Sequence, residues 1–246
     1  MPSSFHKSQA DAGLGEWLSS PLGRQLLLGE AELLRGLLDD VFGLDLLQLG
    51  SWGASRELLS TSRTRRQTVI AAEAGGATDV VARLDALPIQ TASVDAVLLP
   101  HTLEFHPDPH AIVREADRVL TGEGQLIVLG FRPTSLWGLR AAASREGYPF
   151  GLRQMLGSRR VSDWLSLLGY EVVLHRSYLY SRPWGIASGS TRRILRRGLF
   201  NPVPPGAWLL RARKHVYRMT PLRMRFPKER RPVFGQLPEP TARNRP

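Results

Sequence analysis

The sequence contains no cysteine and no long apolar run. The absence of cysteine excludes disulfide bonds, thiolate catalysis and cysteine-ligated zinc or iron–sulfur sites. The six histidines form no HExxH pair, so we expect no metal-dependent enzyme. The leucine run at residues 26–28 is far shorter than the roughly 20 apolar residues of a membrane-spanning helix. Residues 1–15 lack the pattern of a secretory signal peptide, and we therefore expect a cytoplasmic protein.

The positive charge is concentrated near the C-terminus. The formal net charge is +11, from 33 Lys and Arg against 22 Asp and Glu. From Ser190 onward there are fifteen basic residues and two acidic ones, so the preceding part of the chain is close to neutral. A basic segment of this kind can bind nucleic acid through its phosphates, although solvated basic tails are also common. Nucleic acid is therefore a candidate partner of the cluster formed by Arg192, Arg193, Arg196 and Arg197.

Short apolar runs alternate with helical patterns in the middle of the chain. Ser20 and Pro21 predict the N-cap and first residue of an amphipathic helix that reaches about Asp40. We expect strands at residues 44–49, 68–72, 80–82, 94–99, 125–129, 171–178 and 207–213. Helices are expected at residues 56–60, 109–120, 135–143 and 161–168, and around Ile194. This alternation predicts an α/β fold with a parallel sheet covered by helices on both faces.

The chain divides into three parts by pattern. We expect an N-terminal helical cap at residues 1–42, an α/β domain at 43–214 and a basic tail at 215–246. Gly122 and Gly124 are expected to turn the chain into the strand at 125–129. From about Pro221 the chain alternates proline with arginine and lacks periodicity, which is typical of a disordered segment.

A small glycine-containing turn follows the first predicted strand, at Gly50-Ser51-Trp52-Gly53. In an open parallel sheet, ligands bind beyond the carboxyl ends of the strands, where the strand order reverses. Glycine lets the backbone approach a ligand closely, and a helix that follows supplies free N–H groups. A plain strand-to-helix turn has the same composition, so the turn alone leaves ligand binding open.

Motifs downstream of this turn carry a family resemblance. They are Asp85-Ala86-Leu87-Pro88, Ser93-Val94-Asp95-Ala96-Val97, Asp108-Pro109, Arg118-Val119-Leu120, Gly122-Glu123-Gly124 and Leu126-Ile127-Val128. In this order and spacing the chain resembles the class I S-adenosylmethionine-dependent methyltransferases of the methyltransferase type 11 kind, over about residues 44–213. The resemblance implies a Rossmann-like, seven-stranded methyltransferase sheet with a reversed last strand. It also implies an N-terminal helix over the cofactor cleft, and S-adenosylmethionine as the cofactor.

The cofactor turn departs from the family pattern. The family has an acid two residues before a G-x-G-x-G turn, whereas here Gln48 precedes Gly50, Trp52 and Ala54. The resemblance implies cofactor contacts from Gln48, Gly50, Ser51, Trp52, Gly53, Glu73, Asp85, Ala86, Leu87 and Pro100. By its spacing, Glu73 would hold the ribose hydroxyls. The acid that contacts adenine in the family aligns with Arg83, and Asp85 is offset from it by two positions.

His101 is the candidate catalytic residue. It follows the strand at 94–99, where the family places residues that face the substrate. Methyl transfer requires alignment of acceptor and methyl group, and a base is optional. An imidazole of near-neutral pKa could take a proton from an acceptor hydroxyl or amine, or it could bond the backbone at the start of a helix. Glu104 is expected to be a structural or cofactor-side hydrogen-bond partner.

Aromatic and basic residues gather after the strand at 125–129. The aromatic residues are Phe131, Trp137, Tyr148, Phe150, Trp164, Tyr178, Tyr180 and Trp184. They fit a flat or lipid-like acceptor, or a hydrophobic core. The basic residues Arg132, Arg153, Arg159 and Arg160 could bind an anionic acceptor or be solvated.

Two functions from different classes fit the sequence. The first is a methyltransferase that uses S-adenosylmethionine on an unidentified, small-molecule acceptor. The alternative is a catalytically silent methyltransferase-like domain that binds a partner or nucleic acid through its basic C-terminal region. An NAD-dependent oxidoreductase is disfavoured, because no G-x-G-x-x-G motif lies between a predicted strand and a helix.

Overall fold

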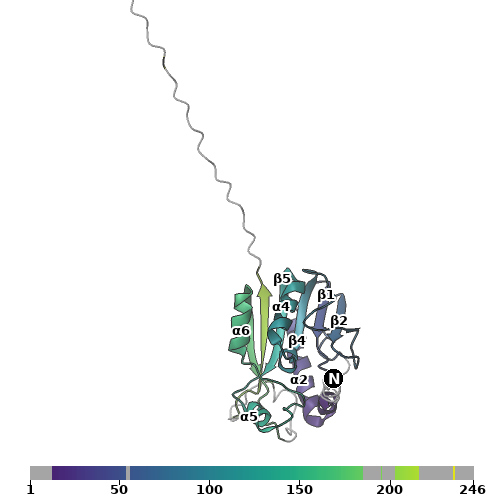
Figure 1. Ribbon diagram of the computed structural model, residues 1–246, viewed down its shortest axis with the longest axis vertical. Coiled ribbons are helices and arrows are strands. Elements are labelled where there is room, and N and C mark those ends of the chain that lie inside the picture. The colour runs from purple at the N-terminus through teal and green to yellow at the C-terminus, as the bar shows by residue number, and fades with distance from the viewer. Residues whose placement is uncertain (1–12, 54–55, 185–194, 196–202, 216–234, 236–246) are drawn as a thin grey trace, which may run out of the picture. The chain divides into compact units, whose positions relative to one another are not determined.

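The computed structural model describes residues 13–53, 56–184, 195, 203–215 and 235, which include one seven-stranded sheet (Figure 1). The strands are β1 Asp45–Leu49, β2 Arg66–Ala71, β3 Val80–Val81, β4 Val94–Pro100, β5 Leu120–Phe131, β6 Tyr170–Tyr178 and β7 Ala207–Lys214. The helices are α2 Pro21–Leu38, α3 Thr102–Phe105, α4 Pro109–Val119, α5 Leu136–Ala143 and α6 Ser158–Leu167. Residues 13–19 are also helical.

The strand order in the sheet is β3-β2-β1-β4-β5-β7-β6. Neighbours from β3 through β5 pair in parallel, whereas β7 is antiparallel to both β5 and β6. The predicted seven-stranded α/β sheet with a reversed last strand is therefore confirmed. The chain runs outward from β1 to β3 and then returns to β4, so the strand order reverses between β1 and β4. The carboxyl ends of these two strands form the switch point at which such sheets bind ligands.

Helices cover both faces of the sheet. Leucines of α2 and Trp137 of α5 pack with one set of sheet residues, which includes Leu46 and Leu98. Residues of α4 and α6 pack with the opposite set, which includes Leu47 and Val97. Neighbouring residues of a strand point to opposite faces, which explains why these two cores alternate along β1 and β4. Figure 1 shows α6 beside β7, and α2 and α5 together at one end of the described fold.

Two predicted helix starts are confirmed by their capping bonds. The Ser20 hydroxyl accepts a hydrogen bond from the backbone N–H of Gly23 at 3.2 Å, and Pro21 is the first residue of α2. The Asp108 carboxylate accepts from the N–H of Ala111 at 3.1 Å at the start of α4. Each cap satisfies an N–H group that has no partner inside its own helix.

The helix predicted at residues 56–60 is wrong, because residues 57–61 form turns. Arg56 has a φ of +59°, in the left-handed region, so an α-helix does not continue through it. The N–H of Leu59 instead bonds the carbonyl of Arg56 at 2.9 Å, and that of Ser62 bonds Leu59 at 3.0 Å. Among residues 56–65, therefore, no helix follows β1 to present N–H groups to a ligand.

The predicted turn at Gly122 and Gly124 lies inside the bounds of β5, at an irregular point where Leu120 pairs with Val94 and the next pair is Gln125 with Ala96. A Cβ atom at Gly124 would come within 2.8 Å of the Leu120 side chain, four residues earlier, so the chain folds back on itself here before the regular part of the strand, as predicted. The other predicted strands and helices are found with ends shifted by a few residues. Apart from Leu195, which is helical, and Gly235, the predicted helix around Ile194 and the predicted disordered tail lie outside the described residues.

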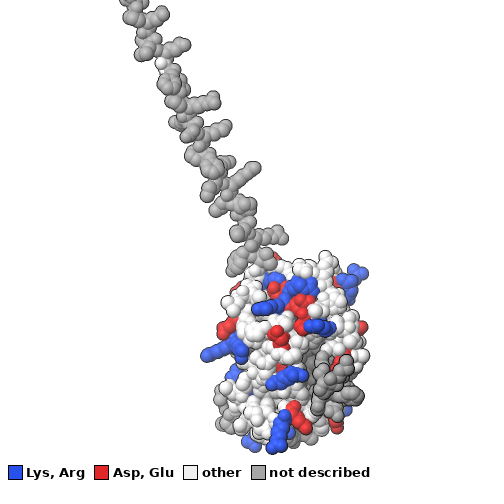
Figure 2. Space-filling view, in the orientation of Figure 1, with Lys and Arg blue, Asp and Glu red and all other residues white. Residues whose placement is uncertain are grey.

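The surface of the described part carries mixed charge. On the face seen in Figure 2, Lys and Arg lie among Asp and Glu and do not form one continuous basic field. The arginine cluster at 192–197 that was the candidate for nucleic-acid binding lies outside the described residues. Within the described residues, no helix has the length and apolar character needed to cross a bilayer.

Candidate functional site

The turn after β1 lies at the switch point and depends on glycine. Gly50 has a φ of +97° and Gly53 a φ of +94°, which residues with a Cβ atom rarely adopt. A Cβ atom at Gly50 would also lie 2.9 Å from the Thr102 hydroxyl. That hydroxyl donates to the carbonyl of Leu49, so the turn packs directly on the start of α3. The tight turn predicted from the sequence is therefore present.

Gln48 fastens this turn from within the sheet. Its side chain is buried, and its amide nitrogen donates to the carbonyls of Gly50 at 3.1 Å and Trp52 at 3.2 Å. A carboxylate cannot donate these bonds, so the residue that departs from the family's acid has a structural task here. The Gln48 Oε1 atom is buried without a hydrogen-bond partner within the described part of the chain.

Trp52, at the second glycine position of the family turn, is turned into the protein. Its side chain is 3% exposed and packs against the ring of His101, with ring centroids 4.3 Å apart. The indole N–H donates to the Glu30 carboxylate at 2.6 Å. Glu30 belongs to α2, so this helix lies against the turn.

Glu30 is fully buried and gathers hydrogen bonds from three separate segments. Besides Trp52, its donors are His101 Nε2 at 2.8 Å and the Tyr178 hydroxyl at 2.8 Å. Tyr178 ends β6, whereas His101 directly follows β4. A buried carboxylate is tolerated when donors surround it in this way, because the bonds replace its lost hydration.

His101 lies between two carboxylates. Its Nε2 bonds Glu30, and its Nδ1 bonds Glu104 Oε2 at 2.9 Å. The other oxygen of Glu104 accepts the backbone N–H of Phe131 at 2.8 Å. His101 has a φ of +57°, a left-handed conformation that this network holds in place. Both ring nitrogens are thus engaged, which is the arrangement of a doubly donating imidazolium.

The charges of this cluster fix its protonation. Burial alone would lower the pKa of His101, but the attraction of Glu30 and the hydrogen bonds to both carboxylates raise that pKa to about 9. Burial raises the pKa of Glu104, against the opposing effect of His101. Burial and then the Glu30 charge raise the pKa of Tyr178. At neutral pH the cluster therefore holds His101 as a cation and Tyr178 as a neutral donor.

The remaining predicted cofactor residues lie in the turn after β1, just beyond β2, between β3 and β4, and at the end of β4. Glu73 is half-buried just beyond β2, Ser51 is exposed in the turn, and Pro100 is the buried last residue of β4. Asp85 accepts bonds from the exposed Arg83 guanidinium at 3.0 and 2.9 Å, and this contact lowers the pKa of Asp85. Ala86 is exposed, while Leu87 is buried and donates its N–H to Glu115 at 2.7 Å.

Sequence reasoning missed Glu30 and assigned Tyr178 only to an aromatic wall. One signal for Glu30 was available: it lies on the apolar stripe of α2, three and four residues from Leu26, Leu27, Leu33 and Leu34. A glutamate on a buried stripe requires a partner, because an unpaired buried charge is expensive. That partner comes from residues 22 to 148 positions away in the sequence, which no local pattern reveals.

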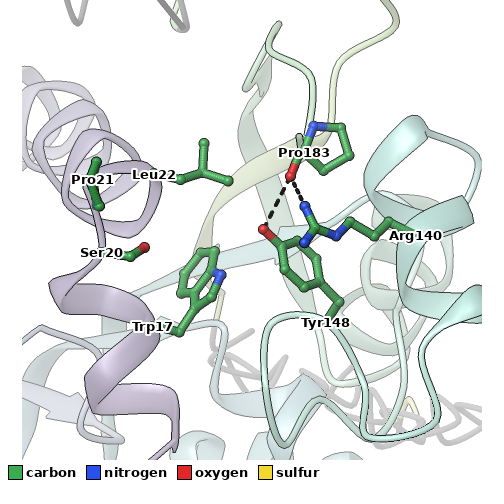
Figure 3. A pocket seen from close by; sticks show the side chains of 7 residues that line it. All are labelled: Trp17, Ser20, Pro21, Leu22, Arg140, Tyr148 and Pro183. Carbon is green, nitrogen blue, oxygen red and sulfur yellow. Dashed lines mark hydrogen bonds between the residues drawn. The ribbon is translucent and has the colours of Figure 1, made fainter. Parts of the chain in front are cut away.

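A surface pocket of about 290 Å³ lies next to the aromatic side of this network (Figure 3). Its lining consists of Trp17, Ser20, Pro21, Leu22, Arg140, Tyr148 and Pro183. Trp17 meets Tyr148 edge-on at 5.9 Å and lies 6.2 Å from Trp52 between ring centroids. Arg140 lies 3.7 Å above the Tyr148 ring, and both side chains donate to the carbonyl of Pro183. Trp17 thus joins the pocket to the buried cluster.

The residues present fit one end of S-adenosylmethionine better than the other. At the nucleoside end, Glu73 and Ser51 offer accessible oxygen atoms for hydroxyl groups, and exposed Ala86 leaves room for a ring. At the methionyl end, the Trp52 indole is buried between α2 and His101 and occupies the side of the turn that faces them. Accessible groups therefore lie on the side expected for the nucleoside, whereas a methionyl group would require Trp52 to move.

Known proteins resemble the chain in sequence and fold. The family model of the methyltransferase domain matches residues 37–128. The uncharacterized protein YafS of Escherichia coli is 35% identical over 175 residues, which are 70% of this chain and 71% of that protein.

Two solved structures share the fold at lower identity. An S-adenosylmethionine-dependent methyltransferase of Thermotoga maritima, a possible histamine N-methyltransferase, is 17% identical with a TM-score of 0.63, covering 81% of this chain and 93% of that one. The (4+2)-cyclase SpnF is 19% identical with a TM-score of 0.52, covering 75% and 80%. A cyclase on this fold means that the fold alone does not define the reaction.

These matches agree with the strand order, the reversed β7 and the turn after β1. The family, the fold class and the family cofactor inferred from the sequence are therefore confirmed. The chain belongs to the class I S-adenosylmethionine-dependent methyltransferase family.

Proposed function

We propose that this protein transfers a methyl group from S-adenosylmethionine to a small-molecule acceptor in the cytoplasm. The observation that supports this most is the convergence of three segments at the switch point of the sheet. They are the glycine turn after β1, the acid beyond β2 and the Pro100-His101 end of β4. In this family these are the segments that face the cofactor and the acceptor.

The nucleoside of the cofactor would be held by accessible groups along this edge. Glu73 would accept hydrogen bonds from the ribose hydroxyls, and the backbone at Ala86 and Leu87 would border the base. The Asp85 carboxylate already accepts two hydrogen bonds from the Arg83 guanidinium. Asp85 would therefore contact the base together with Arg83, as a pair. When bound, the cofactor supplies a sulfonium methyl group for an in-line displacement. The task of the chain is to align the acceptor with that group and to exclude water.

His101 remains the candidate catalytic residue, under a condition set by its neighbours. A base needs a free lone pair, and both nitrogens of His101 bond carboxylates. Glu30 and Glu104 also oppose loss of the imidazolium proton, since they raise the pKa of His101 to about 9. His101 can therefore take a proton from an acceptor only after its contact with Glu30 has been broken and its proton released.

The acceptor enters through the aromatic pocket of Figure 3. Trp17 and Tyr148 present ring faces and edges to a flat, apolar molecule, and Trp17 is in ring contact with Trp52. The volume of this pocket, about 290 Å³, lies near the lower end of the range for ligand sites, roughly 300–1,000 Å³. A small planar acceptor fits these dimensions better than a long lipid chain.

Calorimetry with S-adenosylhomocysteine tests cofactor binding directly. We expect one site, with affinity about tenfold weaker in Glu73→Ala, because each bond to a charged group contributes roughly 1.5–3 kcal/mol. Glu123→Ala is the matched control: Glu123 is 83% exposed, lies near the start of β5 and pairs with Arg213. If Glu73→Ala leaves the affinity unchanged, Glu73 does not bind the ribose hydroxyls.

No heat at saturating ligand would contradict the proposed function. The alternative would then be a silent domain that binds a partner or nucleic acid through the basic C-terminal region. Binding of nucleic acid must weaken steeply with salt and depend on the arginines at 192–197.

A further inference from the structure

A cleft of about 790 Å³ opens beside the first turn of α6. Its lining includes Val172 and Leu210, which pack in the core shared by α4 and α6. Trp52 and Phe131 pack in the other core, under α2, so the cleft lies on the opposite face of the sheet. Its volume is within the range of small-molecule sites, roughly 300–1,000 Å³. The cleft is therefore distinct from the site described above.

The lining of this cleft is positively charged. Arg132 follows β5, Arg159 lies in the first turn of α6, and Asp163 is the acidic residue among them. The Arg132 guanidinium donates to the Ser177 hydroxyl at 3.2 Å. Within the described part of the chain, neither arginine forms an ion pair, so both keep donors for a ligand. Arginine forks of this kind match the oxygens of phosphate.

Two neutral features add donors to the same cleft. His175 of β6 lines it, and burial followed by the nearby Arg132 charge lowers the pKa of this imidazole. Gly157 caps α6 without a side-chain hydrogen bond, so the first N–H groups of that helix have no side-chain acceptor. A Cβ atom built at Gly157 meets no atom within 4 Å, which leaves space in front of the helix end.

We propose that this cleft binds the phosphate group of a small phosphate-bearing molecule. Arg132 and Arg159 contact its oxygens from two sides, and the start of α6 donates backbone N–H groups. His175 donates one ring N–H from β6. Asp163 excludes ligands with a second anionic group on its side of the cleft. The proposal is independent of methyl transfer, because it uses residues of the opposite sheet face.

Titration of the full-length protein with inorganic phosphate, at constant ionic strength in chloride, tests the proposal. The readout is the NMR signal of the His175 ring, recorded without S-adenosylmethionine. We expect saturable binding and a raised pKa of His175, because a bound anion favours the imidazolium. Arg132, Arg159 and Asp163 are the charged groups that line the cleft around this ring, so the pH series is repeated in their variants.

Two pairs of variants distinguish specific phosphate binding in the cleft from nonspecific attraction to positive charge. Arg159→Gln should weaken phosphate binding about tenfold, while Arg160→Gln should leave it unchanged. Arg160 has the same charge and the next position, but it lies over the Trp164 ring and does not line the cleft. Gly157→Asp places a carboxylate where the phosphate binds and caps the helix, so it should abolish binding in a folded protein. Gly157→Asn caps without charge and should retain most of the affinity.

Three results would overturn the proposal. The first is a His175 signal that does not respond to phosphate beyond its response to chloride. The second is equal loss of binding in Arg159→Gln and Arg160→Gln. The third is tight binding of a single-stranded oligonucleotide that depends on Arg132 and Arg159 when inorganic phosphate has no effect. These measurements need no cofactor. Failure of the phosphate proposal can therefore be distinguished from failure of cofactor binding, which calorimetry with S-adenosylhomocysteine measures.

Discussion

Replacing Glu30 by glutamine removes a buried charge while keeping the shape of the side chain. The wild-type Glu30 carboxylate attracts His101 and, together with Glu104, raises the His101 pKa from 6.5 to about 9. At about 1.4 kcal/mol for each pKa unit, this shift corresponds to about 3 kcal/mol of folding free energy. In Glu30→Gln, Glu104 alone remains to hold the imidazolium, so we expect the variant to lose most of that contribution.

The sign of the pH dependence follows from the raised pKa. The folded state holds its His101 proton more tightly than the unfolded chain does. The stabilisation is therefore complete below about pH 6.5 and disappears as the pH rises through about 9. Wild-type protein should exceed Glu30→Gln in unfolding free energy by about 2–3 kcal/mol at low pH, and by less toward pH 9. Deprotonation of Tyr178 also lowers the unfolding free energy, but only at higher pH, because the pKa of Tyr178 is raised above 10.0.

Urea unfolding followed by tryptophan fluorescence, between about pH 6 and pH 9, measures this difference. Glu32→Gln is the control on the same helix, since Glu32 is 50% exposed and pairs with Arg35 at 3.1 Å. We expect its stability to stay within about 0.5 kcal/mol of wild type at each pH. Parallel pH profiles for wild type and Glu30→Gln would refute the assignment of a charged His101–Glu30 contact.

Two further predictions concern the same edge of the sheet. Gly50→Ala should lower the unfolding free energy by about 1–3 kcal/mol in urea unfolding, because its φ of +97° strains any Cβ atom. Gly36→Ala, at an exposed position of α2 with no atom near the added Cβ, should raise the unfolding free energy by up to about 1 kcal/mol. A Gly50→Ala protein more stable than Gly36→Ala would contradict both predictions. Trp52→Gly restores the family's glycine and empties the space beside His101, so S-adenosylhomocysteine should bind more tightly by calorimetry even though the fold is destabilised. Unchanged or weaker binding by a folded Trp52→Gly protein would mean that the indole does not obstruct the methionyl end.

Much of the fold follows from periodic patterns in the sequence. The strands before residue 130 are apolar runs bounded by turns, and α4 repeats apolar residues at Ile112, Val113, Ala116 and Val119. These patterns report burial, which is what fixes the elements in the structure. The capping residues Ser20 and Asp108 were predictable for a similar reason, since each bonds an N–H only three residues away.

The missing helix after β1 shows where local pattern fails. Residues 56–60 contain good helix formers, but Arg56 is fixed by partners distant in sequence. Its guanidinium donates to the carbonyl of Gln67 at 3.2 Å and pairs with Asp79. Asp79 also accepts the N–H of Val69 at 2.8 Å, which ties this loop to β2. Tertiary contacts of this kind override helix propensity, which amounts to less than about 1 kcal/mol per residue.

The sequence predicts where the candidate site lies, whereas the contacts among its side chains could not be predicted. The switch point follows from the strand order, and the turn at Gly50 was visible in the sequence. The bonds of Glu30 to Trp52, His101 and Tyr178 depend on how four segments pack. The sequence could show that Trp52 replaces a glycine, but only the packing reveals that its indole points to α2.

In the proposed cofactor site, space for the methionyl end requires a local change at Trp52. Helix α2 buries six leucines: Leu26, Leu27, Leu33, Leu34, Leu37 and Leu38. At about 1.5–3 kcal/mol for each buried side chain, lifting the whole helix would cost about 9 kcal/mol or more. That cost is comparable with the total stability of a domain, about 5–15 kcal/mol. Rotation of Trp52 exposes one buried side chain, breaks its hydrogen bond to Glu30 and separates its ring from Trp17, His101, Phe105 and Phe131. Lifting α2 also breaks the Glu30 bonds to Trp52, His101 and Tyr178, and it exposes six leucines instead of one tryptophan. Opening through the Trp52 side chain is therefore favoured over movement of α2.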